Sequence, residues 1–236
     1  MNDSVRTAEI QAHFERFTRS VETLSKEAGR AVGEVRLVAV SKNFPIEDVA
    51  SARGLGQRVF GENRVQELLT KVLEAEALGL DVVWHMIGHL QTNKVRQVVG
   101  QVALIHSVDR RRLLNAVEKE ANKKDLVQDV LLQVNVSGEE TKGGFTPEET
   151  EAVIFERERF PHVRIRGLMT MAPFFDDPED AAPVLHELRA LRDRLSKKYD
   201  MPELQELSMG MTNDYPQAIR EGATMLRVGS ALFGSR

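Results

Sequence analysis

The sequence contains no cysteine and no long apolar run. Without cysteine there can be no disulfide, thiolate metal site or cysteine nucleophile, which fits a reducing compartment. The first twenty residues lack the apolar core of a signal peptide, and no later stretch is long enough to span a bilayer. We therefore expect a cytoplasmic protein with no membrane segment.

An excess of one charge is also missing. The chain carries 32 basic and 36 acidic residues, a formal net charge of -4, and both kinds are spread along its length. No basic field is present that would attract nucleic acid or an anionic membrane. The composition therefore argues against both as partners.

The length and composition favour a single domain. At 236 residues, 42% of them hydrophobic, the chain can form one substantial core and lies in the size range of a whole α/β barrel. We expect one domain covering residues 1–236.

Short β-rich runs alternate with helix-like stretches along most of the chain. The strands are expected at 35–41, 58–61, 82–87, 103–108, 130–136, 163–169, 204–208 and 224–228. The helices between them are expected at 46–55, 64–78, 92–99, 110–123, 147–157, 178–198 and 214–221, with a last one from Ser230. An additional amphipathic helix at 4–28 precedes the repeat. Thr146-Pro147-Glu148-Glu149 has the N-cap, proline and carboxylate typical of a helix start.

Eight strand-helix units predict a parallel sheet, and eight strands close into a barrel whose site lies at their carboxyl ends. The main alternative is a doubly wound open sheet. Its glycine-rich phosphate loop after the first strand is absent, because Ser41-Lys42-Asn43-Phe44-Pro45 contains no glycine. The predicted fold is an α/β protein, a single (β/α)8 TIM-type barrel with an extra N-terminal helix.

Lys42 ends the first expected strand. A lysine kept from water is more readily neutral, and a neutral amine attacks an aldehyde to form a Schiff base. The alternative is a strand-end lysine that simply extends into solvent.

The segments after the last two strands favour a phosphate site. Ser208-Met209-Gly210-Met211-Thr212 and Gly229-Ser230 offer hydroxyls and unhindered backbone amides that can hold a dianion. Alternatively, their glycines only permit tight turns. A lysine and a phosphate site on one rim together suggest pyridoxal 5′-phosphate (PLP).

Arg227 precedes the last turn and is expected to point inward. A guanidinium against a pyridine nitrogen would disfavour protonation of that nitrogen and weaken the ring as an electron sink. A structural ion pair is the alternative. His85 and His89 are four residues apart, but Gly88 and the strand context do not match the helical two-histidine zinc motif, so no metal site is expected.

The chain resembles the pyridoxal phosphate homeostasis (YggS/PROSC) family, single-domain relatives of the alanine racemase barrel. The resemblance runs nearly end to end. It rests on Leu37-Val38-Ala39-Val40-Ser41-Lys42, Phe60-Gly61-Glu62-Asn63, Trp84-His85-Met86-Ile87-Gly88-His89-Leu90-Gln91 with Asn93-Lys94, Asn135-Val136-Ser137-Gly138-Glu139 with Lys142 and Gly144, Arg166-Gly167-Leu168-Met169-Thr170-Met171, Leu207-Ser208-Met209-Gly210-Met211, and Arg227-Val228-Gly229-Ser230 with Phe233-Gly234.

This resemblance implies roles for eight residues. Lys42 would carry PLP as the internal aldimine, and Arg227 would face the pyridine nitrogen. The phosphate would contact Thr212, Gly229 and Ser230, and the ring would be lined by Asn63, Met171 and Met209. The chain departs from the family pattern at Asn43-Phe44, at Arg64 and at Thr212, where the last keeps the hydroxyl of the usual serine.

The resemblance further implies a PLP-binding protein of vitamin B6 homeostasis, which buffers the cofactor or delivers it to apo-enzymes without robust turnover. Such a protein would be a carrier or regulator of PLP and not an enzyme, with no established catalytic residue, and it would act as a monomer. The alternatives are a PLP-dependent amino acid racemase, with Lys42 and either water or Tyr215 as its bases, and a Schiff-base aldolase. The loop containing His89, Gln91, Asn93 and Lys94 has no assigned role.

Overall fold

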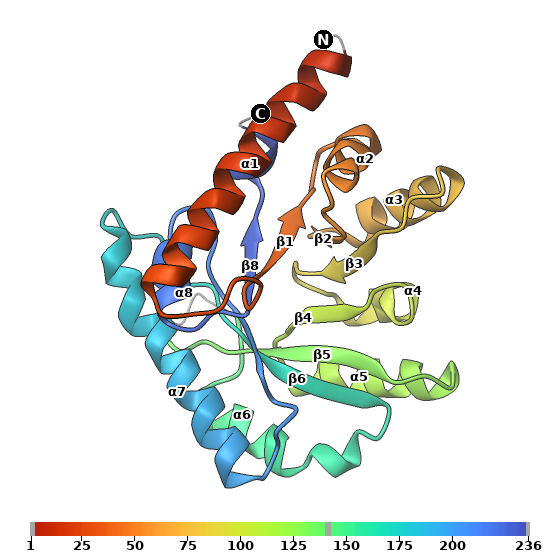
Figure 1. The fold of residues 1–236 in the computed structure, drawn as a ribbon. Helices are drawn as coiled ribbons and strands as arrows, with labels where there is room; N and C mark the ends of the chain where they lie inside the picture. Colours follow the sequence, from red (N-terminus) through yellow and green to blue (C-terminus); the bar gives the residue numbers. More distant parts are fainter. Residues whose placement is uncertain (1–2, 140–142, 235–236) are drawn as a thin grey trace.

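Eight parallel strands form a closed barrel in the computed structural model, which describes residues 3–139 and 143–234 (Figure 1). The strands are β1 (Arg36–Val40), β2 (Val59–Glu62), β3 (Val83–Met86), β4 (Leu104–Val108), β5 (Gln128–Gln133), β6 (Val163–Met169), β7 (Glu206–Ser208) and β8 (Met225–Val228). Each strand pairs with the next along the chain, and β8 pairs with β1 to close the ring. The expected (β/α)8 barrel is confirmed. Lys142 lies outside the described residues.

Helices follow the strands and surround the barrel (Figure 1). They are α1 (Asp3–Glu27), α2 (Ile46–Gly54), α3 (Val65–Ala77), η1 (Thr92–Lys94), α4 (Val95–Val98), α5 (Arg111–Lys123), α6 (Pro147–Phe155), η2 (Arg157–Arg159), η3 (Pro178–Ala181), α7 (Ala182–Lys198), α8 (Tyr215–Arg220) and α9 (Ser230–Phe233). The extra helix expected before the barrel is α1. The capping box expected at Thr146 is present, because its side chain accepts from the Glu149 N–H and Glu149 accepts in return.

Some expected boundaries were wrong. The stretch expected as one helix at 178–198 begins as η3, which Asp177 caps, and continues as α7. The strand expected at 130–136 ends at Gln133, because the backbones of Gln133 and Asn135 bond to that of Phe145. The apolar periodicity of a sequence does not reveal that a strand's backbone changes its hydrogen-bond partner.

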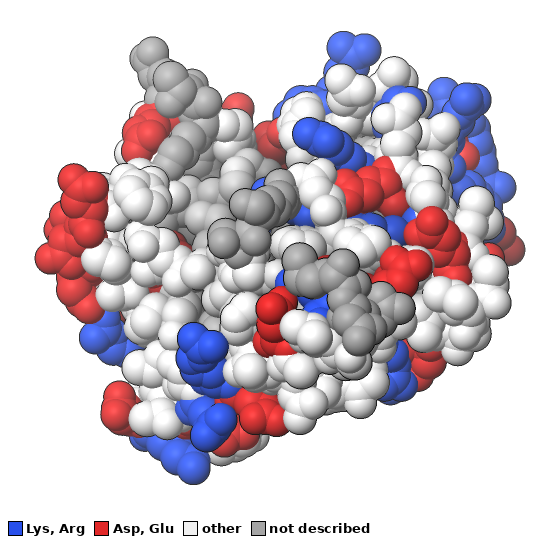
Figure 2. Space-filling view, turned by 90° about the horizontal axis from the view of Figure 1, so that it is seen from above, with Lys and Arg blue, Asp and Glu red and all other residues white. Residues whose placement is uncertain are grey.

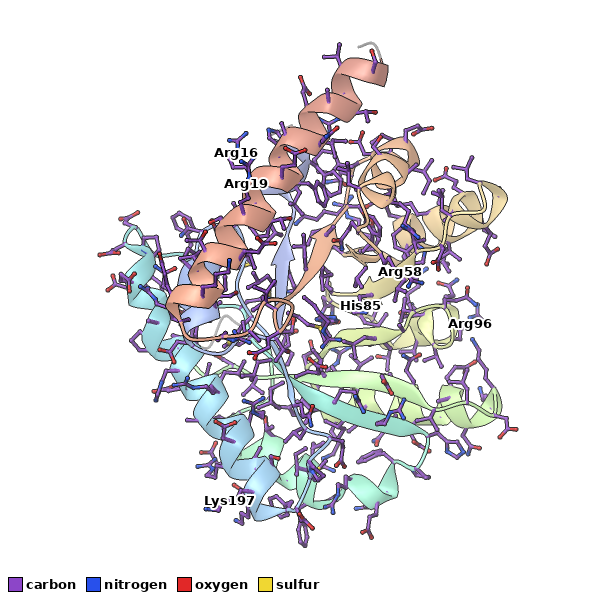
Figure 3. The ribbon with its side chains drawn as sticks, viewed as in Figure 1. Arg16, Arg19, Arg58, His85, Arg96 and Lys197 are labelled. Atoms are coloured by element: carbon purple, nitrogen blue, oxygen red, sulfur yellow. The ribbon has the colours of Figure 1, made fainter. Side chains whose placement is uncertain are left out.

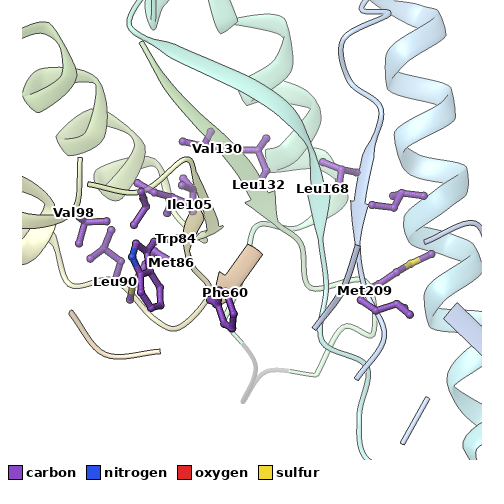
Figure 4. Packing of buried hydrophobic residues seen from close by; sticks show 14 of the residues in the cluster. Phe60, Trp84, Met86, Leu90, Val98, Ile105, Val130, Leu132, Leu168 and Met209 are labelled. Carbon is purple, nitrogen blue, oxygen red and sulfur yellow. The ribbon is translucent and has the colours of Figure 1, made fainter. Parts of the chain in front are cut away.

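The barrel separates two apolar layers. The larger cluster lies between strands and helices and includes Phe60, Trp84, Ile105 and Leu132 (Figure 4). The smaller cluster comprises the inward-facing apolar residues Val38, Val40, Ile87, Leu104, Leu131, Met169 and Met225. Because neighbouring residues on a strand face opposite sides, a strand such as β1 or β5 contributes to both layers. Burial of these surfaces is the main term that stabilises the fold.

Helix α1 lies along the outside of the barrel near the closure between β8 and β1 and packs on α2, α8 and α9 (Figure 1). No helix among the described residues is long and apolar enough to cross a membrane. Acidic and basic side chains are interspersed with uncharged ones on the face seen in Figure 2.

Candidate functional site

A cavity of about 440 Å³ opens at the carboxyl ends of the barrel strands, where sites in this fold are found. It is lined by Val40, Lys42, Phe44, Asn63, Ile87, Met171, Met211, Thr212, Asn213, Arg227, Gly229, Ser230 and Gly234. The lining includes every site residue expected from the sequence except Met209. Its volume lies within the range of small-molecule sites.

Met209 does not line the cavity. It is completely buried in the layer between the strands and the helices, where it contributes to the outer core (Figure 4). The physical reason is alternation along the chain: Ser208 points into the barrel, where it bonds to Arg227 and His106, so the next side chain points outward. The role expected for Met209 as a ring contact is therefore corrected.

Lys42 follows Ser41, the first residue after β1, and a buried ionic cluster holds Ser41 in place. The Lys71 Nζ atom donates to the Ser41 carbonyl at 2.6 Å and contacts the carboxylates of Glu62 at 2.6 Å and Glu67 at 3.0 Å. The Ser41 hydroxyl donates to the same Glu62 oxygen at 2.7 Å. Burial raises the pKa of Glu62, although Lys71 acts in the opposite direction. These contacts fix the end of β1 and thus the position from which Lys42 extends.

The Lys42 side chain is itself exposed at the cavity. The shielding from water that the sequence led us to expect is therefore not supplied by the protein side chains alone. A ligand filling the cavity would have to exclude water from this amine.

Asn63 presents an acceptor that is not satisfied within the described part of the chain. Its Oδ1 atom is buried without a hydrogen-bond partner, and the residue lines the cavity. Gly88 holds it in place through a close approach: a Cβ atom at Gly88 would lie 2.3 Å from the Asn63 carbonyl oxygen. A buried acceptor without a partner is costly, so its presence at the cavity favours a ligand with a donor there.

Arg227 on β8 is buried inside the barrel beneath the cavity. Its guanidinium donates to the Ser208 hydroxyl at 2.7 Å and to the Thr170 carbonyl at 2.8 Å. Burial lowers its pKa to about 10, while the Asp214 carboxylate acts in the opposite direction. The group therefore stays positively charged at neutral pH. Its neutral partners do not form the direct ion pair that the sequence left open as an alternative.

Two hydroxyls meet where the loops after β7 and β8 come together. Thr212 Oγ1 and Ser230 Oγ lie 3.2 Å apart and both residues line the cavity. The neighbouring glycines also have structural roles. Gly210 has a φ of 91° that favours glycine, and a Cβ atom at Gly229 would lie 3.1 Å from the Val40 carbonyl oxygen.

The tyrosines lie away from the cavity. The Tyr215 hydroxyl hydrogen-bonds Ser20 on α1 at 2.9 Å, and the Tyr199 hydroxyl donates to Glu151 at 3.0 Å. Neither residue is among those that line the cavity. Tyr215 is therefore not placed to act as a second base opposite Lys42.

The histidines considered for a metal site separate in the structure. His89 lies on the rim with its Nδ1 atom 3.1 Å from an Asp109 oxygen, whereas His85 lies inside the barrel. Among the described residues, no group of three or more His, Cys, Asp or Glu could hold a metal ion.

Sequence reasoning missed the apolar walls of the cavity. Val40 and Ile87 face inward from the ends of β1 and β3, and Phe44 comes from the loop after β1. Val40 and Ile87 could have been found from their alternation with outward-facing neighbours. Phe44 carries no such signal, because it lies in a loop. With these walls and a few convergent polar groups, the cavity has the composition of a cofactor site.

Comparison with known proteins places the chain in a family. Residues 12–236 match the family model described as alanine racemase, N-terminal domain. The chain is 46% identical over 226 residues to the pyridoxal phosphate homeostasis protein of Aquifex aeolicus, an alignment covering 94% of this chain and 97% of the relative. The human protein of the same name is 40% identical over 210 residues, which cover 85% of this chain and 76% of the relative.

Solved structures agree with these matches. PipY of Synechococcus elongatus, solved with PLP bound, is 36% identical with a TM-score of 0.80, covering 91% of this chain and 99% of that protein. An alanine racemase from Corynebacterium glutamicum is 15% identical with a TM-score of 0.73, covering 98% of this chain and 62% of that protein. At this identity the racemase likeness concerns the fold alone.

Proposed function

Since this chain belongs to the family of pyridoxal phosphate homeostasis proteins, we propose that it binds PLP in the cavity at the carboxyl ends of the strands. The observation that carries the proposal is the meeting of Lys42, Arg227 and the hydroxyl pair of Thr212 and Ser230 around one cavity. The amine of Lys42 matches the aldehyde of PLP, the guanidinium of Arg227 matches its pyridine nitrogen, and the two hydroxyls match its phosphate.

The site residues expected from the sequence that line the cavity each have a role in this proposal. Lys42 anchors the aldehyde as a Schiff base, while Thr212, Gly229 and Ser230 hold the phosphate. Asn63 and Met171 line the ring. When bound, PLP supplies a reactive aldehyde and an electron-withdrawing ring.

Arg227 limits how strongly that ring is activated. The Ser208 hydroxyl and Thr170 carbonyl hold its guanidinium, which is charged at neutral pH and can donate to the pyridine nitrogen. A cation at this point disfavours protonation of the nitrogen, and an unprotonated ring withdraws fewer electrons. This arrangement suits a protein that holds PLP without promoting fast chemistry on it.

The proposed activity is to buffer or deliver PLP rather than to turn over a substrate. The described residues lining the cavity include one amine and one guanidinium but no carboxylate, histidine or tyrosine. A racemase that works with two bases needs a second such group opposite the lysine. Delivery would take apo PLP-dependent enzymes as partners, and we propose that the protein acts as a monomer.

The test is the absorption spectrum of the purified protein before and after borohydride reduction, followed by peptide mass mapping. We expect a band at visible wavelengths that reduction abolishes, with the reduced PLP adduct on Lys42. Lys42→Ala should lose the band and the adduct, whereas Lys119→Ala, on the exposed face of α5, should retain both. Absence of a band and adduct with excess PLP would refute the proposal.

The same preparation separates a carrier from a racemase. A carrier should show no appreciable steady-state racemisation of a panel of amino acids and no exchange of their α-proton in deuterated water. Exchange that is lost in Lys42→Ala would instead support the racemase.

A further inference from the structure

Four polar side chains form a continuous hydrogen-bonded column through the barrel. Arg227 on β8 donates to Ser208 on β7 at 2.7 Å, and the Ser208 hydroxyl lies 2.8 Å from His106 Nδ1 on β4. The Nε2 atom of His106 lies 2.9 Å from His85 Nδ1 on β3. All four residues are buried. Barrels of this kind usually fill their interior with branched apolar side chains, so a polar column calls for an explanation.

Only the first bond of the column has a fixed direction: a guanidinium can only donate, so the Ser208 oxygen accepts from Arg227. The two bonds beyond it depend on the histidine tautomers. In one arrangement, the Ser208 hydroxyl donates to His106 Nδ1. A neutral His106 then carries its hydrogen on Nε2 and donates it to His85 Nδ1. His85 in turn carries its hydrogen on Nε2.

Burial keeps both rings neutral. It lowers the pKa of His85 to about 3, with Arg36 acting in the same direction. It also lowers the pKa of His106 well below its ordinary value, and the positive charges of Arg227 and Arg36 act in the same direction. Both rings are therefore neutral at physiological pH, as the column requires.

The column ends at a second pocket. His85 lines a hollow of about 260 Å³ at the amino ends of the strands, opposite the PLP cavity. The Nε2 atom has no hydrogen-bond partner among the described residues, and the ring is buried at the centre of the barrel (Figure 3). This nitrogen is not among the buried polar atoms that lack a partner, so it is reached from the hollow, where in this tautomer it can donate to a ligand.

Besides His85, the hollow is lined by acidic and basic side chains and by an apolar floor. Arg36 pairs with Glu206, and Arg166 lies 3.8 Å from Asp129. The lining thus carries two cations and two anions, and Arg164, outside the lining, also donates to Asp129 at 2.6 Å. The apolar lining consists of Val38, Val59, Val83, Ala103, Leu104 and Met225.

We propose that this pocket binds a free α-amino acid with a small apolar side chain. Its carboxylate would accept from His85 Nε2 and face Arg36, its ammonium group would face Glu206 or Asp129, and its side chain would lie on the apolar floor. A ligand with only a carboxylate would meet two like charges, and so would a ligand with only an amine. The proposal goes beyond PLP binding and does not depend on it.

The test is isothermal titration calorimetry with L-valine. Borohydride-reduced protein is used, because fixing PLP on Lys42 removes the aldehyde that would react with an amino acid and fills the upper cavity. If the protein binds no PLP, the untreated chain serves for the same titration. Failure of the PLP proposal is thus recorded separately by the absorption spectrum.

We expect L-valine to bind, and isovalerate and isobutylamine, which each lack one charged group, to bind at least about 10-fold more weakly. Arg36→Gln and His85→Phe should each weaken L-valine roughly 10- to 100-fold. Arg36→Gln keeps the test valid if His85→Phe does not fold, because Arg36 is half exposed at the pocket mouth. Arg58→Gln is the matched control, since Arg58 pairs with Asp81 outside the pocket.

Three results would overturn the proposal. They are no heat of binding at millimolar L-valine, equal binding of the two single-charge analogues, and binding that neither Arg36→Gln nor His85→Phe reduces.

Discussion

At the residue scale, the unusual feature is the pair of neutral histidines inside the barrel. His85 and His106 each bond through one ring nitrogen to the other, at 2.9 Å, and His106 continues the chain to Ser208. Both rings are neutral, so each bonds the other inside the barrel without a charged partner. Protonating either ring would bury a charge, and this makes folding sensitive to acid.

Lowering the pH from 7 to 5 should destabilise the protein through His85. The pKa of His85 in the folded state, about 3, lies below its ordinary value of 6.5. Between pH 3 and pH 6.5, His85 therefore binds a proton in the unfolded chain but stays neutral in the folded chain. Stability from this residue is complete above about pH 6.5 and falls as the pH drops toward 3, by about 2 kcal/mol at pH 5. Denaturant unfolding at both pH values measures this loss. His85→Asn should lose about 2 kcal/mol less than the natural chain, and an equal loss would contradict the assignment.

At the element scale, glycine allows neighbouring strands to meet. A Cβ atom at Gly167 on β6 would lie 2.0 Å from the Glu206 carbonyl oxygen on β7. This backbone belongs to the strand pairing itself and cannot rotate away as a side chain can. The joint between β6 and β7 therefore depends on the missing side chain.

Gly167→Ala should lower the free energy of unfolding by roughly 3 kcal/mol or more, because the strands must separate to admit the methyl group. Gly54→Ala at the end of α2 is the control, since no atom lies within 4 Å of the place its methyl group would take and its φ is not positive. It should change stability by less than about 1 kcal/mol. Denaturant unfolding of both variants tests the difference, and similar midpoints would argue against a tight joint.

At the scale of the whole molecule, α1 ties the start of the chain to its end. Arg6 donates two hydrogen bonds to the buried Asp48 carboxylate on α2, at 2.6 and 3.1 Å, and one to the Phe233 carbonyl on α9, at 2.9 Å. Helix α9 begins at Ser230, a residue that lines the cavity at the carboxyl ends of the strands. One side chain therefore joins three helices near the point where the barrel closes.

Arg6→Ala should lower stability by about 2 kcal/mol, because it leaves the Asp48 carboxylate buried without its charged donor. Arg16→Ala on the same helix is the control, since Arg16 is exposed and points away from the barrel (Figure 3). It should change stability by less than about 0.5 kcal/mol. Thermal and denaturant unfolding measure both, and equal stability of the two variants would refute this role of Arg6.

The sequence predicted much of the candidate site because the barrel places the carboxyl ends of its strands on one rim. Lys42, Arg227 and Ser230 could be assigned to that rim from strand order alone, and the structure places them around one cavity. Met209 was misplaced because a shift of one residue reverses the face of a strand. The exact ends of a strand, which decide that face, depend on pairing with its neighbours.

The sequence by itself determined the alternation of strands and helices, since apolar periodicity and capping residues act over a few positions. Only the tertiary structure decided which buried polar groups are partners. His106 and Ser208 are 102 positions apart, and Arg227 and Thr170 are 57 apart, yet both pairs bond inside the barrel. No local pattern records such pairs, because they exist only once β8 has closed against β1 and brought all eight strands around one axis.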